Sequence, residues 1–272
     1  AFGVRPRETV RNMLLAIDVG NTQTVVGIYQ DGSLQYRWRV ATNKSHTSDE
    51  LRVKLVPLLA SEGLKLDDVR GVALASVVPA LTMAWCAAAY RMIGKDALVC
   101  SAETAGSLFE ADYPNPHEIG ADRVADAVAA KALYGAPVIV VDFGTATNME
   151  VVDADGRFIG GVIAPGVETS ASALFSHATK LGAIDLVDPH TAIGHNTEEA
   201  IQAGIVYGEA DRVDGIIRRI FAQLGYETPV VATGGLASRV AAQSQTITAI
   251  NPELTLEGLR LVYEAQEGAA SV

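Results

Sequence analysis

Two short apolar segments of this 272-residue chain each end in an aspartate, and a turn rich in glycine and threonine follows each. The first segment ends at Asp18 and the second at Asp142. In both cases an Asp-Gly pair follows thirteen positions later, at Asp31 and at Asp155. The matched spacing predicts a duplicated unit of three strands joined by two turns, with one copy in each half of the chain.

The chemistry of these turns suits a bound phosphate. A carboxylate at the end of a strand can hold a hydrated cation, and the following turn offers N–H groups and hydroxyls to phosphate oxygens. Either turn taken alone is also a common way for a strand to end, with a solvated aspartate. Their repetition favours two turns that clamp one nucleotide. A Gly-x-x-x-x-Gly-Lys-Ser/Thr sequence does not occur, which argues against a P-loop.

The charge and composition of the chain limit its partners. The 21 basic and 32 acidic residues give a formal net charge of −11 and a pI near 4.9. This balance argues against non-specific binding to nucleic acid or to an anionic membrane. The hydrophobic content of 49% indicates a packed protein, and no apolar run is long enough to cross a membrane. Cys86 and Cys100 lack metal or redox spacing, which predicts reduced, buried thiols in a cytoplasmic protein.

The order of the segments predicts a mixed α/β chain with two similar halves. Residues 1–12 are basic and lack periodicity, and we expect a tail or an expression remnant before a native start at Met13. We predict an N-terminal domain over residues 13–135 and a C-terminal domain over residues 136–265. Residues 266–272 are expected to be a second tail.

Local signals predict several helix ends. Thr47 and Glu50 have the spacing of a capping box at the start of a helix. Further helices are expected to end at Leu181, to run from Asn196 to Leu224, and to run from about Leu256 to Glu264. The proline-rich segment 113–117 is expected to lack regular structure.

Four positions allow both a structural and a chemical interpretation. Asp122 follows the proline-rich segment at a helix start, where it could cap the helix or take a proton from a substrate hydroxyl. Arg123 could form a surface ion pair or bind a carboxylate. Thr197 stands in the first turn of a capped helix, and its hydroxyl could face a ligand. The Gly234-Gly235 pair could be a tight turn or a close approach of the backbone to a nucleoside.

With these residues in view, the sequence resembles the type III pantothenate kinases, a family that includes proteins called Bvg accessory factor. The resemblance extends over about Met13 to Glu264. It rests on the segments Asp18-Val19-Gly20-Asn21-Thr22, Pro116-His117-Glu118-Ile119-Gly120-Ala121-Asp122-Arg123, Asp142-Phe143-Gly144-Thr145-Ala146-Thr147, Gly160-Gly161-Val162-Ile163-Ala164-Pro165-Gly166, Ile193-Gly194-His195-Asn196-Thr197 and Thr233-Gly234-Gly235-Leu236-Ala237. Several independent motifs in the family order are far more specific than any one of them.

The resemblance implies a fold and an activity. The fold is that of the acetate and sugar kinase, Hsp70 and actin superfamily, with two RNase-H-like domains around an ATP cleft. The activity is ATP-dependent phosphorylation of pantothenate to 4'-phosphopantothenate, the first step of coenzyme A synthesis. The family uses Mg²⁺ with ATP and a monovalent cation, K⁺ or NH₄⁺. A cytoplasmic homodimer is implied, with the substrate pocket close to the subunit interface.

The same resemblance assigns roles by position. Asp122 would be the proton acceptor, Asp142 would hold the monovalent cation, and Asp18 would govern the Mg²⁺–phosphate region. The residues expected to contact ATP are Asp18, Val19, Gly20, Asn21, Thr22, Gln23, Thr24, Val25, Thr145, Gly234 and Gly235. The residues expected to contact pantothenate are Tyr113, Gly120, Ala121, Asp122, Arg123 and Thr197.

The chain departs from the family pattern at two places. After Thr147 the family usually has another threonine, an aromatic residue and an aspartate, whereas this chain has Asn148, Met149 and Glu150. Gln23 replaces the asparagine, arginine or threonine that usually follows the first Gly-Asn-Thr. Because Asn148 keeps hydrogen-bonding ability and Glu150 keeps an acid, we expect the function to be retained.

Two other functions stay open at this point. One is a nucleotide-regulated accessory protein without kinase activity, as the older family name suggests. The other is a kinase of the same fold that acts on another small acceptor. The intact segment Gly120-Ala121-Asp122-Arg123 favours a kinase, because a protein that only senses ATP needs no carboxylate beside a second substrate.

Overall fold

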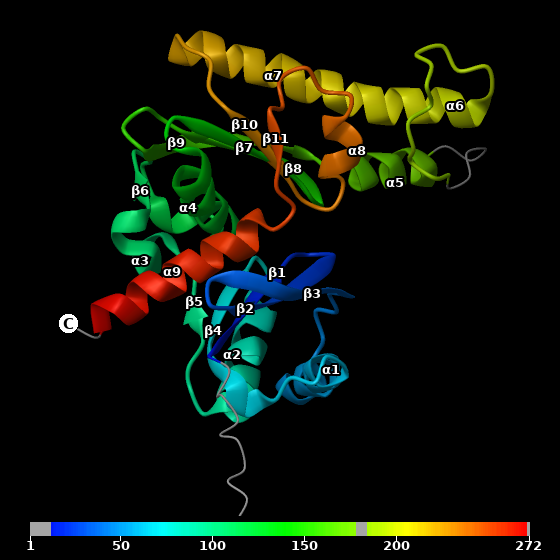
Figure 1. Ribbon diagram of the computed structural model, residues 1–272. Coiled ribbons are helices and arrows are strands. Elements are labelled where there is room, and N and C mark those ends of the chain that lie inside the picture. The colour runs from blue at the N-terminus through cyan, green and yellow to red at the C-terminus, as the bar shows by residue number, and fades with distance from the viewer. Residues whose placement is uncertain (1–11, 178–183, 271–272) are drawn as a thin grey trace, which may run out of the picture. The chain divides into compact units, whose positions relative to one another are not determined.

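The structure, a computed structural model, describes residues 12–177 and 184–270 (Figure 1). The predicted tail before Asn12 and the predicted helix end at Leu181 lie outside the described residues. The chain divides into two compact units. The first unit comprises Ala1–Ala105, Gly120–Asp122 and Leu259–Val272, and the second comprises Gly106–Ile119 and Arg123–Gly258. The predicted domains are continuous segments, whereas each compact unit takes residues from more than one segment.

The first unit is built on a five-stranded sheet in the order β3-β2-β1-β4-β5. Its strands are β1 (Met13–Val19), β2 (Gln23–Gln30), β3 (Ser33–Ala41), β4 (Val69–Ser76) and β5 (Leu98–Val99). β1, β2 and β3 pair antiparallel in succession, which confirms the first predicted three-strand unit. β4 runs parallel to β1, and β5 runs parallel to β4.

Two helices, α1 (Ser48–Ser61) and α2 (Pro79–Ile93), cover one face of this sheet. Their apolar side chains form one buried cluster with alternate residues of β1, as expected for an amphipathic helix on a strand face. The predicted capping box is confirmed. The Glu50 N–H donates to Thr47 Oγ1 at 3.3 Å, and the Thr47 N–H donates to the Glu50 carboxylate at 2.8 Å. Shorter helical segments are η1 (Leu66–Asp68) and α3 (Ala102–Ala105).

The second unit contains a six-stranded sheet in the order β11-β10-β7-β8-β9-β6. Its strands are β6 (Glu110–Ala111), β7 (Val138–Phe143), β8 (Ala146–Val152), β9 (Arg157–Pro165), β10 (Val230–Thr233) and β11 (Ala249–Ile250). β7, β8 and β9 pair antiparallel, and β10 runs parallel to β7 as β4 does to β1. The second predicted copy is therefore confirmed, with β6 added beside β9.

The helices α5 (Val167–His177), α7 (Gly208–Leu224) and α8 (Ala237–Ala241) pack with one face of the second sheet. The predicted long helix consists of α6 (Thr197–Gln202), a π-helical turn η4 (Ala203–Tyr207) and α7, which lie in line in Figure 1. Asn196 caps it as predicted, because the Glu199 N–H donates to Asn196 Oδ1 at 2.9 Å. Two 3₁₀ turns, η2 (Gly106–Leu108) and η3 (Pro116–Glu118), precede α4 (Ala121–Tyr134).

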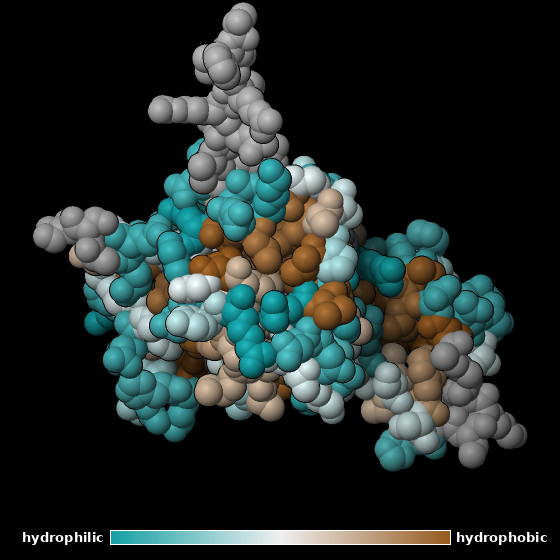
Figure 2. Space-filling view, turned by 90° about the horizontal axis from the view of Figure 1, so that it is seen from below, coloured by the Kyte–Doolittle hydropathy of each residue, from teal (hydrophilic) through white to brown (hydrophobic). Residues whose placement is uncertain are grey.

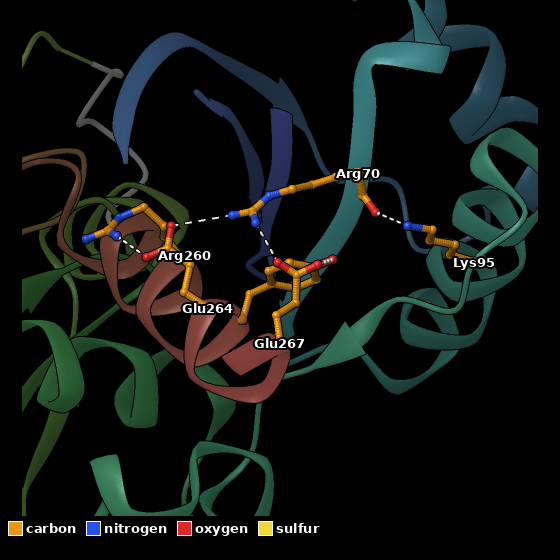
Figure 3. Close-up of polar contacts among 6 residues, drawn as sticks. Arg70, Lys95, Arg260, Glu264 and Glu267 are labelled. Carbon is orange, nitrogen blue, oxygen red and sulfur yellow. Dashed lines mark hydrogen bonds and ion pairs between the residues drawn. The ribbon is translucent and has the colours of Figure 1, made fainter. Parts of the chain in front are cut away.

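The last helix, α9 (Leu254–Ala270), is longer than the predicted segment and enters the region expected to be a tail. Its second half is fastened to the first unit (Figure 3). The Arg70 guanidinium of β4 contacts Glu264 and Glu267, and the Tyr263 hydroxyl donates to Glu267 Oε1 at 2.9 Å. Gly71 permits this packing, since a Cβ at that position would overlap the Tyr263 ring.

Two local predictions were wrong. Residues 113–117 were expected to lack regular structure, but Pro116 opens the 3₁₀ turn η3, where its missing N–H leaves no bond unmade. Both cysteines are free, and Cys100 is buried as predicted. Cys86 is only half-buried, because it lies on α2 beside the buried stripe that contains Trp85.

The surface combines hydrophilic residues with separate apolar patches (Figure 2). Large apolar side chains are exposed on both units, most strongly at Val53, Met83, Ile163 and Ile193. Among the residues that the structure describes, no helix combines the length and the apolar character that crossing a membrane requires.

Candidate functional site

Asp18 lies at one edge of the first sheet, as the second-last residue of β1. β1 and β4 are parallel, and their register pairs Val19 with Ser76, so both strands end at this edge. The Asp18 side chain is half-buried, while the turn residues Asn21 and Thr22 are exposed. Ligands of α/β proteins bind outside the carboxyl ends of parallel strands, which makes this edge a candidate site.

The turn after Asp18 is held by its own hydrogen bonds. The Gly20 N–H donates to the Gln23 carbonyl at 3.0 Å, and a Cβ on Gly20 would lie 2.9 Å from that oxygen. The Thr42 N–H donates to the Thr22 carbonyl at 2.9 Å, and the hydroxyls of Thr24 and Thr42 are 2.8 Å apart. The turn is therefore shaped before a ligand arrives, which favours electrostatic binding of an anion.

The segment Gly120–Asp122 reaches the same edge of the first unit. Val77, the residue after β4, donates its N–H to the Val19 carbonyl at 3.1 Å. A Cβ on Gly120 would lie 3.8 Å from Val77 Cγ1 and 2.6 Å from Asp122 Oδ1, so this glycine leaves the space that the carboxylate uses. The structure thus brings the predicted residues Asp18 and Asp122 to one sheet edge.

Asp122 is not the N-cap of α4, contrary to the structural interpretation of its position. The helix begins at Ala121, so Asp122 lies within its first turn, and its side chain is half-buried. A carboxylate is favoured there by the partial positive charge of the helix N-terminus.

Asp142 has in the second unit the position that Asp18 has in the first. It is the second-last residue of β7, and the parallel strand β10 places Thr233 beside it. Gly234 follows with φ +92°, and a Cβ there would overlap both the Asp142 carboxylate and the Phe143 carbonyl. Only glycine lets the backbone lie so close to this acid. Gly235, the next residue, is exposed.

The turn after Asp142 is clamped to the start of α5. The Gly166 N–H donates to the Thr145 carbonyl at 3.1 Å, and the Thr169 hydroxyl donates to the same oxygen at 2.6 Å. The Gly144 N–H donates to the Ala146 carbonyl at 3.0 Å. The exposed Thr145 side chain therefore stands on a fixed backbone, as a phosphate contact requires.

Polar side chains continue from Asp142 along one face of the second sheet. Asn148 of β8 is the cross-strand partner of Asp142, and Glu150 shares its face because side chains alternate along a strand. The Asn148 Oδ1 atom is buried and accepts no hydrogen bond from the residues that the structure describes. The fully buried Glu150 accepts a hydrogen bond from Arg123 Nε at 2.9 Å.

Arg123 and Tyr113, both predicted to contact pantothenate, meet at the ring of Phe158. The Arg123 guanidinium carbon lies 5.3 Å from the ring centroid, and the Tyr113 ring lies edge-on at 5.9 Å. The Arg123 side chain is only 12% exposed, so the ion pair that the sequence suggested is buried and not superficial. A Cβ on Gly161 would overlap the Met149 carbonyl of the neighbouring strand and would lie 3.0 Å from Arg123 Nη2, so only glycine fits at that position.

Thr197, the remaining predicted contact of pantothenate, lies apart from the residues described above. Thr197 is exposed at the first residue of α6, and no contact among the described residues joins it to either sheet edge. Sequence reasoning missed Phe158, because an apolar residue in a strand carries no signal beyond burial. Glu150 was noted only as a departure, although its position two residues after Asn148 could have placed it on the Asp142 face.

Comparison with known proteins gives a consistent match. The profile of a family described as type III pantothenate kinase matches residues 14–219. A type III pantothenate kinase of Moorella thermoacetica is 45% identical over 252 residues, which cover 93% of this chain and 99% of that protein.

Two solved structures share the fold at low identity. The ethanolamine utilization protein EutJ of Carboxydothermus hydrogenoformans has a TM-score of 0.56 at 15% identity, covering 95% of this chain and 91% of that one. The ROK hexokinase of Thermus thermophilus has a TM-score of 0.50 at 14% identity, covering 94% and 100%. These likenesses confirm the predicted mixed α/β fold.

Proposed function

The chain belongs to the type III pantothenate kinase family, and on that premise we propose that it transfers the terminal phosphoryl group of ATP to pantothenate. The product is 4'-phosphopantothenate, and the reaction is the first step of coenzyme A synthesis. The observation that supports this most directly is that Asp18 and the segment Gly120–Asp122 lie at the same edge of the first sheet, where β1 and β4 end. A phosphate turn beside a carboxylate that can accept a proton is what transfer to an alcohol requires.

We assign the proton acceptor role to Asp122. As the acceptor oxygen bonds to phosphorus, the Asp122 carboxylate takes the hydroxyl proton, and the bond between phosphorus and the bridging oxygen of ADP breaks. Phosphoryl transfer needs positioning and charge neutralisation more than covalent catalysis. A positioned base adds roughly 10²- to 10⁴-fold to the rate.

We assign the ATP phosphates to the turns that follow Asp18 and Asp142. In the first unit the contacts belong to residues 18–25, and in the second unit to Thr145, Gly234 and Gly235. Kinases of this family use ATP with a divalent metal ion, which we propose to be Mg²⁺ near Asp18. The half-buried Asp18 carboxylate fits this ion, because Mg²⁺ is usually bound by one or two carboxylates together with substrate phosphates.

We assign the monovalent cation, K⁺ or NH₄⁺, to Asp142. The described residues contain no group of three or more His, Cys, Asp or Glu side chains that could hold a metal, and we place a neutral oxygen beside the Asp142 carboxylate in this site. The Asn148 Oδ1 atom fits this need. It is buried, it accepts no hydrogen bond within the described part of the chain, and it belongs to the cross-strand partner of Asp142. When bound, the cation supplies positive charge that offsets the charge of the phosphates.

We assign pantothenate to Tyr113, Arg123 and Thr197, together with Gly120 and Ala121 next to Asp122. The planar guanidinium of Arg123 can donate hydrogen bonds to a carboxylate or carbonyl oxygen of pantothenate. The Phe158 ring supports this assignment, because Tyr113 and Arg123 both pack on it.

We further propose a homodimer that works in the cytoplasm and binds neither nucleic acid nor membranes. Exposed Met83 and Ile193, at 74% and 77%, are apolar surface that a partner subunit could cover. The net charge of −11 supports the exclusion of polyanionic partners.

An acceptor screen tests the proposed function. We expect ADP release when ATP, Mg²⁺, pantothenate and either K⁺ or NH₄⁺ are all present, and a large loss of rate when any one is omitted. Sugars and other small alcohols serve as competing acceptors in the same assay. Protein that stays inert with pantothenate under all cation conditions, or that prefers a sugar, would overturn the proposal.

A further inference from the structure

We infer that Glu150 is a positioning residue of the acceptor site: with Phe158, it orients Arg123 for contact with pantothenate. This inference rests on the proposed function and adds to it a role for Glu150, the acid that stands where the family pattern usually has an aspartate. Glu150 lies on β8, two positions after Asn148 on the face that carries Asp142. Through its contact with Glu150, Arg123, which we assign to pantothenate binding, is bonded to β8, the strand that also carries Asn148 of the proposed cation site.

The contact with Glu150 orients the guanidinium of Arg123. Glu150 Oε1 accepts from Nε at 2.9 Å, the donor nearest to the aliphatic stem of Arg123. A bond at Nε fixes the rotation of the planar group, and it does not itself use the outer edge formed by the two terminal nitrogens. That outer edge is the part of the side chain that matches a planar acceptor group of a ligand.

Phe158 supplies a second and independent restraint. The guanidinium carbon lies 5.3 Å from the ring centroid, within the range of a cation–π contact. The ring is itself held by Phe109, at a centroid distance of 5.6 Å, and is 1% exposed. Glu150 therefore restrains the guanidinium at Nε, and the Phe158 ring restrains it through the cation–π contact. Together they limit the rotation of the Arg123 side chain.

Burial keeps the Arg123–Glu150 ion pair away from water. The Glu150 side chain is 0% exposed and that of Arg123 is 12% exposed, so neither charge can turn to water without breaking the pair. Buried ion pairs add little to stability compared with apolar residues of similar volume. Stability alone therefore does not explain this buried pair. Holding Arg123 in place for the substrate does.

A double-mutant cycle tests the inference. The variants are Glu150→Gln, Arg123→Ala and the combination, and the readouts are KM for pantothenate, kcat, and the shift of the melting temperature on adding pantothenate. We expect Glu150→Gln to raise KM roughly tenfold with a smaller change in kcat, and Glu150→Asp to recover part of the loss. In the Arg123→Ala background, Glu150→Gln should change KM by less than about twofold, because its effect passes through Arg123.

Two further variants keep the test decisive if Glu150→Gln folds poorly. Phe158→Leu removes the ring beside the guanidinium and should raise KM. Its effect should be smaller in the Arg123→Ala background, where only the contact with Tyr113 is left to lose. Asp214→Asn is the matched control: it changes another buried carboxylate, 2% exposed, which Ser244 and Thr246 hold through hydrogen bonds. It should leave KM for pantothenate unchanged.

The outcomes separate this inference from the proposed function. Wild-type protein that neither phosphorylates nor is stabilised by pantothenate would refute both. Active wild-type protein whose KM is the same after Glu150→Gln, or in which the Glu150 and Arg123 effects multiply in full, would refute only the positioning role.

Discussion

The two units carry the same hairpin but different side chains on the strand that follows the turn. In each, an aspartate is the second-last residue of the first strand, and that strand pairs with one antiparallel and one parallel neighbour. Val25 lies opposite Asp18, whereas Asn148 lies opposite Asp142. Two positions further along, the first unit has Gly27 where the second has Glu150.

This difference shows how a duplicated backbone can divide its tasks. The opposing strand of the first unit is apolar at these positions, and the extra carboxylate at its edge comes from Gly120–Asp122, far along the chain. The second unit builds its polar groups into β8 itself. We therefore expect proton transfer to depend on the first edge, and cation binding and acceptor anchoring to depend on the second.

The largest effect should come from the first edge. Asp122→Asn removes the proposed proton acceptor but keeps the shape of the side chain, so kcat should fall by roughly 10²- to 10⁴-fold. The K⁺ concentration that gives half-maximal activity should not change, because we assign the cation to Asp142 of the other unit. Steady-state kinetics with varied pantothenate and varied K⁺ measure both quantities.

Asp126→Asn provides the matched control for this substitution. Asp126 lies one turn further along α4, is 1% exposed, and accepts a hydrogen bond from the Thr255 hydroxyl at 2.7 Å. Its replacement should lower the melting temperature and leave kcat nearly unchanged. Equal losses of kcat in the two variants would mean that Asp122 acts on the structure of the helix and not on the proton.

An intermediate effect should come from making the second hairpin resemble the first. Asn148→Val places at the Asp142 edge the residue type found opposite Asp18, and it removes the proposed oxygen ligand. We expect the apparent affinity for K⁺ to fall by about 10- to 100-fold, the loss typical of disturbed metal-site partners. Titration of activity with K⁺, and of the melting temperature with K⁺ in the absence of substrate, measure the change.

The reciprocal variant sharpens the comparison. Val25→Asn gives the first hairpin the polar residue of the second. It should not create a new K⁺ requirement, since Val77 follows β4 in the first unit where Gly234 follows β10 and approaches Asp142 in the second. If Asn148→Val leaves the K⁺ dependence unaltered, the cation site does not include Asn148.

The smallest effect concerns how α9 stabilises the first unit. Burial, together with the hydrogen bond to Glu267, raises the pKa of Tyr263 to about 12. A tyrosine whose pKa rises on folding contributes stability that is complete below its unfolded value of about 10 and is lost as the pH rises toward 12. The denaturant concentration at the unfolding midpoint should therefore fall less between about pH 10 and 12 in Tyr263→Phe than in the wild type. An identical fall in wild type and variant would show that Tyr263 does not carry the effect.

Local signals explain which parts of the fold could be predicted from the sequence. The capping box at Thr47 and the cap at Asn196 depend on residues within one helical turn, and both are present. The paired hairpins were predictable because apolar strands and Asp-Gly turns occur at matched spacing. The end of α9 was not, because its last turns are fixed by Arg70, a residue 197 positions away from its partner Glu267.

The candidate site divides in the same way. The positions of Asp18 and Asp142 at sheet edges follow from strand patterns and could be predicted. The burial of Arg123 against Glu150 and Phe158 could not, because it depends on how β8 and β9 are placed beside the start of α4. An ion pair between residues 27 positions apart leaves no spacing signal in a single sequence.

The π-helical turn between α6 and α7 bears on how relatives of this chain should be aligned. A π-helical turn holds one residue more than the α-helix needs, so the residues before it are rotated by about 100° relative to an unbroken helix. A relative lacking one residue between Ala203 and Tyr207 would keep α7 in place yet direct Thr197 toward another side. Helical periodicity counted across this turn would then assign the wrong face to every side chain of α6.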